Sequence, residues 1–519
     1  MSERMSAADA AVLLRESRTA PQHVGGLAVF AAPPGGFDYE RLVRLLEERI
    51  SHAPRYRQKV RSVLGHLAHP VWIDDPTFDI TYHVRRSTLP RPGTEQQLLD
   101  FAARIQARPL DRAHPLWEMY LVEGLEGEAD RSHAGRVAIA TKTHAALVGE
   151  PDGIDLTQVI LDAARAPRRT VEPIWMPEPE PTNLALVGDA VRDVLRRPTA
   201  LTYAARVAAQ DARTAAARVT GARGGVFAMA GGLLHRGSAD PLRVEPGEQR
   251  RLAVARTRLD DYRQVRDAFG AAVNDVALAV VAGALRGWLL ARAVPLRPAT
   301  SMHALLPVSV ADASGADEMF GAARGNPSGA GKYPMSTIGR VRPVLVELPV
   351  GEPDPLVRLA QLRYAMATHR ASGDAVRAHR LVGLSGFAPP TVHALGARAA
   401  SERGRRSVNL VVTNVPGPQV PLYAAGARMI EIFPVQPLLP GHALSIALTS
   451  YDGGVYYGLN GDWAAMRDIG LLSDLIEESL GELVTAAPRH SLGRASRPRR
   501  RRNRPAAREE LTPRGPVST

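Results

Sequence analysis

Large apolar residues alternate with small or polar ones along residues 136–143. This period of two predicts a half-buried β-strand. The strand runs into His144, a loop rich in Gly and Asp follows, and apolar residues with helical spacing resume over 154–162. A histidine between a strand end and such a loop is a position where a fold can hold a general base, although a lone histidine there is more often structural.

The same patterns predict alternating helices and strands through the first third of the chain. Helical spacing predicts helices over 7–14, 37–53 and 94–107. Extended patterns predict strands over 23–34, 72–83, 117–123 and 136–143. The alternation predicts an α/β (α+β) fold in which helices pack on mixed sheets.

A Pro-rich stretch, EPIWMPEPEPT, interrupts this pattern over residues 172–182. Beyond it, residues 184–219 are predicted to be helical, and the Gly-rich stretch 221–247 is predicted to be a linker or lid. A second α/β unit begins near Arg250. The domains are therefore expected at 1–170, 171–245 (linker) and 246–487, with a tail over 488–519.

Composition narrows the class of protein. The chain has 519 residues, of which 45% are hydrophobic, and no run of 18 apolar residues predicts a membrane span. The absence of cysteine excludes disulfides, thiol catalysis and thiolate metal sites. No signal peptide, metal-ligand spacing or phosphate-binding glycine loop is recognised, so a cytoplasmic protein without a metal is expected.

Positive charge is concentrated in the tail. Residues 488–519 contain ten Arg and two Glu, so they hold +8 of the net charge of +12. The basic run Arg497–Arg504 lacks apolar periodicity and is expected to be disordered. It is either a solvated tail or a segment attracted to an anionic membrane or lipid-droplet surface. Nucleic-acid binding is not expected, because no accompanying motif supports it.

Three further segments carry a family resemblance. They are PLWEMYLVEGLEG (115–127), VNDVALAVVAGALRGWL (273–289) and NVPGPQVPLYAAGARM (414–429). Together they resemble the bacterial wax ester synthase/diacylglycerol acyltransferase family. The resemblance implies two chloramphenicol-acetyltransferase-like domains with a tunnel between them. It also implies acyl-CoA as a substrate, diacylglycerol or a long-chain alcohol as acceptor, and no cofactor.

The family's central motif is a lysine-containing strand followed by HHxxxDG, and this chain departs from it. Without gaps, Lys142 matches the lysine and His144 the first histidine. Ala145 then stands at the second histidine, which is the family's general base, and Gly149 at the aspartate. A gapped alternative assigns Asp152-Gly153 to the Asp-Gly role but displaces the following helix.

Two residues could replace the missing base. Neighbouring strand residues point to opposite faces, so His144 is expected to point away from the tunnel if position 145 points into it. Glu150, in the altered loop, is the other candidate.

The resemblance also places several residues at the tunnel. Asn274 and Asp275 match a family Asn-Asp pair near the pocket, but Asn274 would equally serve to cap a helix. Asn414, Pro416 and Gly417 form a turn whose expected role is to shape the tunnel. Ala145 and Gly149 complete the expected set.

Two functions follow. The first is an O-acyltransferase that makes triacylglycerol or wax esters. The second is a catalytically impaired relative that binds acyl-CoA or lipid surfaces, or regulates an active paralogue.

Overall fold

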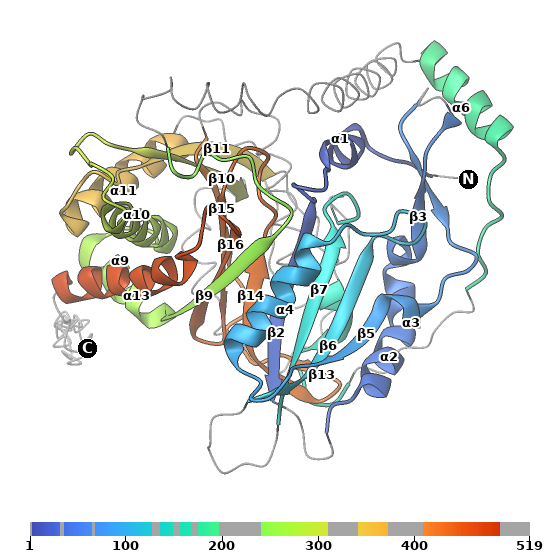
Figure 1. Cartoon of the computed structure of the whole chain (residues 1–519), viewed down its shortest axis with the longest axis horizontal. Coiled ribbons are helices and arrows are strands. Elements are labelled where there is room, and N and C mark those ends of the chain that lie inside the picture. Colours follow the sequence, from blue (N-terminus) through green and yellow to red (C-terminus); the bar gives the residue numbers. More distant parts are fainter. Residues whose placement is uncertain are drawn as a thin grey trace, which may run out of the picture.

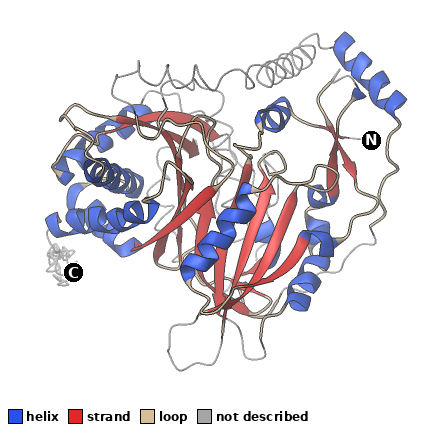
Figure 2. Ribbon diagram, viewed as in Figure 1, coloured by secondary structure: helices blue, strands red, loops and turns tan. Residues whose placement is uncertain are grey.

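The computed structural model describes residues 3–31, 36–64, 68–126, 135–148, 156–167, 175–196, 240–309, 341–371 and 408–487. Two large sheets stand side by side, and helices cover their outer faces (Figures 1 and 2). The expected α/β architecture is confirmed. The Gly-rich stretch 221–239, the altered loop 149–155 and the tail 488–519 lie outside the described residues, so the predictions made for them stay predictions.

The first large sheet has seven strands in the order β5-β6-β7-β2-β14-β13-β8. Its strands are β2 (His23–Ala31), β5 (Val84–Thr88), β6 (Trp117–Leu125), β7 (Arg136–His144), β8 (Leu161–Asp162), β13 (Tyr423–Ala424) and β14 (Ala427–Val435). In its centre, β7 pairs antiparallel with β2 and β6, and His144 lies opposite His23. Both edges of β7 are therefore paired, and eight of its nine residues are buried, polar ones included.

Helices and short turns surround this sheet. They are α1 (Ala7–Arg15), α2 (Tyr39–Glu47), α3 (Ile80–His83), α4 (Glu95–Ala107), α5 (Leu156–Ile160) and the 3-10 turns Ile50–His52 and Pro54–Arg57. The start of α4 shows why the sequence folds locally as predicted. The Thr94 hydroxyl accepts from the Gln97 N–H at 3.3 Å, and the Gln97 side chain accepts from the Thr94 N–H at 2.7 Å. The predicted strand 72–83 is wrong in its second half, where Asp79 caps the short helix α3.

The second large sheet has six strands in the order β11-β10-β12-β15-β16-β9. Its strands are β9 (Arg250–Arg258), β10 (Met302–Ser309), β11 (Val341–Leu348), β12 (Leu410–Val415), β15 (Leu444–Tyr451) and β16 (Gly454–Asp462). The helices on its outer face are α9 (Leu259–Phe269), α10 (Val273–Ala291), α11 (Pro355–Ala371) and α13 (Ile469–Ala486). A separate three-stranded sheet is formed by β1 (Glu3–Arg4), β3 (Gln58–Arg61) and β4 (Val71–Asp74), and α6 (Asn183–Arg196) packs near it.

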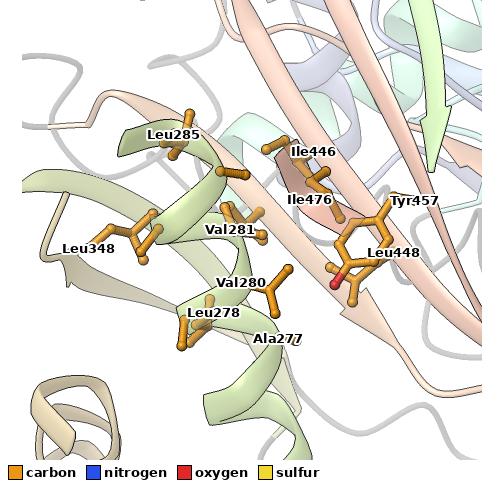
Figure 3. Packing of buried hydrophobic residues seen from close by; sticks show 14 of the residues in the cluster. Ala277, Leu278, Val280, Val281, Leu285, Leu348, Ile446, Leu448, Tyr457 and Ile476 are labelled. Atoms are coloured by element: carbon orange, nitrogen blue, oxygen red, sulfur yellow. The ribbon is translucent and has the colours of Figure 1, made fainter. Parts of the chain in front are cut away.

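Helix α10 forms the centre of the second core. Figure 3 shows its residues Val280 and Val281 beside side chains from the sheet, such as Ile446 and Leu448. Full burial of one such aliphatic side chain contributes about 1.5–3 kcal/mol. Of the helices that the structure describes, α10 is long and apolar enough to cross a membrane, but most of it is buried within the protein. Its apolar character is thus explained by the core that it builds.

Strand β14 joins the two halves of the chain. It lies within the range 246–487, yet its residues 428–435 pair antiparallel with β2 of the first sheet. It also lies against β15 and β16 of the second sheet (Figure 1). The division of the chain into two units remains a prediction. The structure shows in addition that β14 crosses from one half to the other and holds the two sheets together.

Candidate active site

The end of β7 delivers His144 into a buried polar cluster. The His144 Nε2 and the His23 Nε2 lie 3.5 and 3.3 Å from the same Glu16 Oε1. Both are close contacts, although neither has the alignment of a hydrogen bond. The second Glu16 oxygen is 2.7 Å from Arg112. Glu16 follows α1, so the amino-terminal helix anchors the histidine at the motif.

Charge in this cluster is set by burial and by close partners. Burial alone would raise the pKa of Glu16, but His144 and then His23 lower it well below its usual range. Burial lowers the pKa of His23, against the opposing effect of Glu16. Glu16 is therefore an ionised carboxylate inside the protein, held by its neighbours.

The His144 ring is already engaged on its other side. Its Nδ1 accepts a hydrogen bond from the Ala146 N–H at 3.0 Å, which leaves that nitrogen without a proton. The remaining proton is then on Nε2, toward Glu16. Both ring nitrogens are committed, so His144 has no lone pair available to accept a proton from an alcohol. The expectation that His144 points away from the tunnel stays a prediction.

Ala145, which the ungapped match places at the family's base position, is a core residue. Its backbone N–H donates to the Gln22 carbonyl at 2.8 Å, and its methyl group is fully buried among apolar residues that include Val148 and Leu156. It offers no proton acceptor. Gly149 and Glu150 lie outside the described residues, so their predicted roles stay predictions.

Lys142, the motif lysine, is also inside the protein. Its Nζ lies 3.4 Å from the Glu118 carboxylate, and its side chain is buried. Burial lowers the pKa of Lys142, although Glu118 opposes that shift. Within the described ranges, no cluster of three or more His, Asp or Glu has an arrangement that could hold a metal ion.

The structure brings two of the predicted tunnel segments together. The Asn414 Nδ2 at the end of β12 donates to the Asn274 Oδ1 in the first turn of α10 at 3.1 Å. The prediction that Asn274 caps α10 is wrong, because the helix begins one residue earlier, at Val273. Asp275 does the capping instead, since its Oδ2 accepts from the Ala272 N–H at 3.1 Å.

The turn after Asn414 is fixed by side chains of neighbouring segments. The Gly417 N–H donates to the Ser450 hydroxyl at 3.1 Å, and Gln419 donates to the same hydroxyl. Pro416 and Gly417 are half-buried. These contacts hold the turn in one shape beside the Asn274–Asn414 pair.

Two cavities border these residues. A narrow apolar groove of about 10 Å³ lies between β2, β7, β14 and α5, and its lining includes Gly26, Thr141 and Ile160. A polar depression of about 690 Å³ lies at the start of α10, where Arg266, Asp275 and Arg363 line it. The first is lined almost wholly by apolar surface and has room for about one water-sized group, whereas the second has charged walls.

The fold and these segments define the chain as a protein of the chloramphenicol-acetyltransferase-like class. Residues 5–277 match the domain family described as "wax ester synthase/diacylglycerol acyltransferase catalytic domain". Residues 340–484 match the family described as "WS/DGAT C-terminal domain". The chain belongs to the wax ester synthase/diacylglycerol acyltransferase family, as its sequence predicted.

Named relatives agree with this membership. Over 476 residues the chain is 30% identical to the probable diacylglycerol O-acyltransferase tgs1 of Mycobacterium tuberculosis, covering 91% of this chain and 93% of the relative. It is 44% identical over 268 residues to the probable diacylglycerol O-acyltransferase tgs3 of the same species, covering 51% of this chain and 96% of tgs3.

Solved structures show the same fold. The wax ester synthase/diacylglycerol acyltransferase from Marinobacter aquaeolei VT8 superposes with a TM-score of 0.60 at 25% identity, covering 93% of this chain and 99% of that one. The first condensation domain of the CDA synthetase has a TM-score of 0.50 at 15% identity, with coverage of 94% and 97%.

Proposed function

We propose that this chain transfers a fatty acyl group from acyl-CoA to diacylglycerol or a long-chain alcohol. The observation that carries the proposal is the family match, which spans both halves of the chain. The Asn274–Asn414 contact supports it, because the two family segments that contain these residues meet.

The reaction requires the acceptor hydroxyl to attack the thioester carbonyl while its proton moves to a base. The thiolate of CoA then leaves as the ester forms. A positioned base contributes typically 10²–10⁴ in rate. Ala145 cannot act as that base, and both nitrogens of His144 are engaged. Neither of these two residues therefore supplies the proton acceptor, and turnover is expected to be slow.

The same two residues favour a second candidate function. A relative that binds acyl-CoA or lipid but turns it over at a negligible rate needs the fold and the tunnel, and does not need the base. Such a protein could also regulate an active paralogue. Ala145 is the specific observation in its favour.

One experiment separates the two candidates. Purified protein is incubated with palmitoyl-CoA and either diacylglycerol or hexadecanol, and acceptor-dependent release of CoA is measured beside binding of palmitoyl-CoA. Acceptor-dependent release above a heat-denatured control supports the transferase. Saturable binding without release supports the second candidate. Absence of both would overturn the family-based proposal.

We also propose that the chain is cytoplasmic and contacts an anionic membrane or lipid-droplet surface through Arg497–Arg504. The support is the concentration of positive charge in the tail, because each basic residue near an anionic surface contributes about 1 kcal/mol. A diacylglycerol acceptor resides in such a surface, so this contact would bring the protein to its substrate.

A further inference from the structure

Glu16 contacts two groups that support the turn after β7. Its Oε1 accepts a hydrogen bond from the Gln22 N–H at 3.4 Å and lies 3.5 Å from the His144 Nε2. Its Oε2 lies 2.7 Å from Arg112, whose side chain is 52% exposed. The Glu16 side chain is 9% exposed, so one carboxylate reaches from the end of α1 into the interior.

Each of these two groups holds one N–H of the turn. The Gln22 carbonyl accepts from the Ala145 N–H at 2.8 Å, and the His144 Nδ1 accepts from the Ala146 N–H at 3.0 Å. The two N–H groups belong to the peptide groups on either side of the Ala145 Cα. Because a peptide group is planar and rigid, holding both of them sets φ and ψ at Ala145. The direction of the side chain at position 145 is thereby fixed.

This support begins where the regular strand pairing ends. The register of β7 with β2 runs from Arg136 to His144, which lies opposite His23, so Ala145 is the first residue beyond it. The Leu147 N–H donates to the His144 carbonyl at 2.9 Å and closes the turn. Glu16 therefore acts on the chain at the point where the sheet ceases to fix it.

We propose that Glu16 is a positioning residue for the side chain at position 145, acting through Gln22 and His144. It does not touch the substrate, and it takes no part in bond making. The inference rests on the proposed function for its effect on turnover, whereas its effect on the turn can be measured without turnover.

Three variants of Glu16 separate the reach of the carboxylate from its charge. Glu16→Leu removes both oxygens. Glu16→Asp keeps the charge on a side chain one methylene shorter, so its carboxylate is expected not to reach Gln22, His144 and Arg112 together. Glu16→Gln keeps the length and one acceptor oxygen, so it is expected to preserve the turn even though it lowers the global stability.

Asp468→Leu is the control for a loss of stability alone. The Asp468 side chain is 32% exposed at the start of α13, and its Oδ2 accepts from the Arg292 Nε at 2.8 Å. This variant also takes a carboxylate away from an arginine, but on the outer face of the second sheet. The turn at Ala145 is expected to behave in it as in the wild type.

Two measurements on the full-length protein report on the turn directly. Amide hydrogen exchange at Ala145 and Ala146 is expected to be about fivefold faster in Glu16→Leu and Glu16→Asp, the change that corresponds to one net hydrogen bond. Nitrogen NMR of His144 is expected to show the Nε2–H tautomer alone in the wild type and both neutral tautomers in Glu16→Leu. If Glu16→Leu does not fold, Glu16→Asp gives the exchange comparison.

Kinetics test the consequence for the reaction. Acceptor-dependent release of CoA from palmitoyl-CoA is measured for each variant, alone and combined with Ala145→His. Because Glu16 acts on orientation, kcat is expected to fall in Glu16→Leu and Glu16→Asp while KM for palmitoyl-CoA stays unchanged. Any gain from Ala145→His is expected to be lost when Glu16→Asp is added and kept when Glu16→Gln is added.

The outcomes distinguish the inference from the proposed function. Exchange at Ala145 and Ala146 that is unchanged in Glu16→Leu and Glu16→Asp would overturn the inference, and so would an equal acceleration in Asp468→Leu. Neither result would affect a proposed function that stands on release of CoA by the wild type. Faster exchange in the Glu16 variants of a protein that neither binds nor turns over palmitoyl-CoA would overturn the proposed function and support the positioning of the turn.

Discussion

Asn414 and Asn274 are 140 residues apart in the chain, yet the Asn414 Nδ2 donates to the Asn274 Oδ1 at 3.1 Å. One residue ends a strand of the second sheet, and the other is in the first turn of the helix that packs on it. The contact links two segments that the sequence associates with the tunnel. It also requires that Asn274 be released from capping, a role that Asp275 fills.

This contact predicts an energetic coupling. Asn274→Ala and Asn414→Ala should each destabilise the protein, and the double variant should be less destabilised than the sum by about 1 kcal/mol, the usual net value of a hydrogen bond. Urea denaturation of the three variants measures it. If the double variant lost unfolding free energy equal to the sum of the two single losses, the two amides would not interact in solution.

A second prediction concerns Glu16. The partners of Glu16 hold its pKa below the ordinary value, so the folded protein binds fewer protons than the unfolded chain in acid. Its contribution to stability is present above pH 4.5 and is lost as the pH falls below that value. Glu16→Gln should destabilise the protein by about 1–3 kcal/mol at pH 7, because a neutral amide no longer attracts the Arg112 guanidinium and leaves the two buried histidines with a single acceptor oxygen. A denaturation midpoint equal to that of the wild type at pH 7 would refute this role.

His83 gives a third prediction, in a different pH range. It stacks on Trp117 with ring centroids 4.5 Å apart, and its Nδ1 is 2.9 Å from the Trp117 carbonyl. Burial lowers the pKa of His83 to about 4, so only the unfolded chain gains a proton between pH 6.5 and 4. Stability should therefore fall by about 3 kcal/mol across that window as the pH decreases.

The variant that checks this is His83→Phe, which keeps the stacking and cannot be protonated. The difference in unfolding free energy between wild type and variant, measured from pH 7 to pH 4, isolates the histidine from other acid-sensitive groups. The unfolding free energy of the wild type should fall more steeply with decreasing pH than that of the variant. Parallel curves would mean that the pKa of His83 is the same in the folded and unfolded states.

The sequence predicted much of the fold because its elements carry local signals. The strand at β7 follows from its period of two, and α4 from its helical spacing and its Thr94 cap. The pairing of β14 with β2 could not be predicted, because nothing local in residues 427–435 distinguishes a strand that leaves its own half of the chain.

The candidate site, like the fold, was only partly predictable from the sequence. The family motif indicated His144, Ala145, Asn274 and Asn414. The partners of His144 were missed, because Glu16 and His23 come from an unrelated stretch of sequence and are brought to it only by the sheet and by α1.

The tail provides a fourth prediction. Deleting residues 488–519 should leave the denaturation midpoint and any activity on soluble substrates unchanged, because the segment has no apolar face to dock. Binding to vesicles that contain anionic lipid should fall, and in the intact protein it should weaken as salt screens the charges. Equal vesicle binding by both forms at low salt would dismiss the proposed membrane contact.

The account's central claim is that the family fold is present while the motif base is missing at Ala145. The most direct measurement is kcat/KM with palmitoyl-CoA and an acceptor alcohol for wild type, Ala145→His and the triple change Ala145→His, Gly149→Asp, Glu150→Gly. Ala145→Phe is the size-matched control, because it adds a ring that accepts no proton. The account predicts about a tenfold gain for the single change and none for the control. For the triple change it predicts a gain that exceeds an additive estimate, within the 10²–10⁴ of a positioned base. A wild type that already equals the triple variant would contradict it, because another group would then be serving as the base.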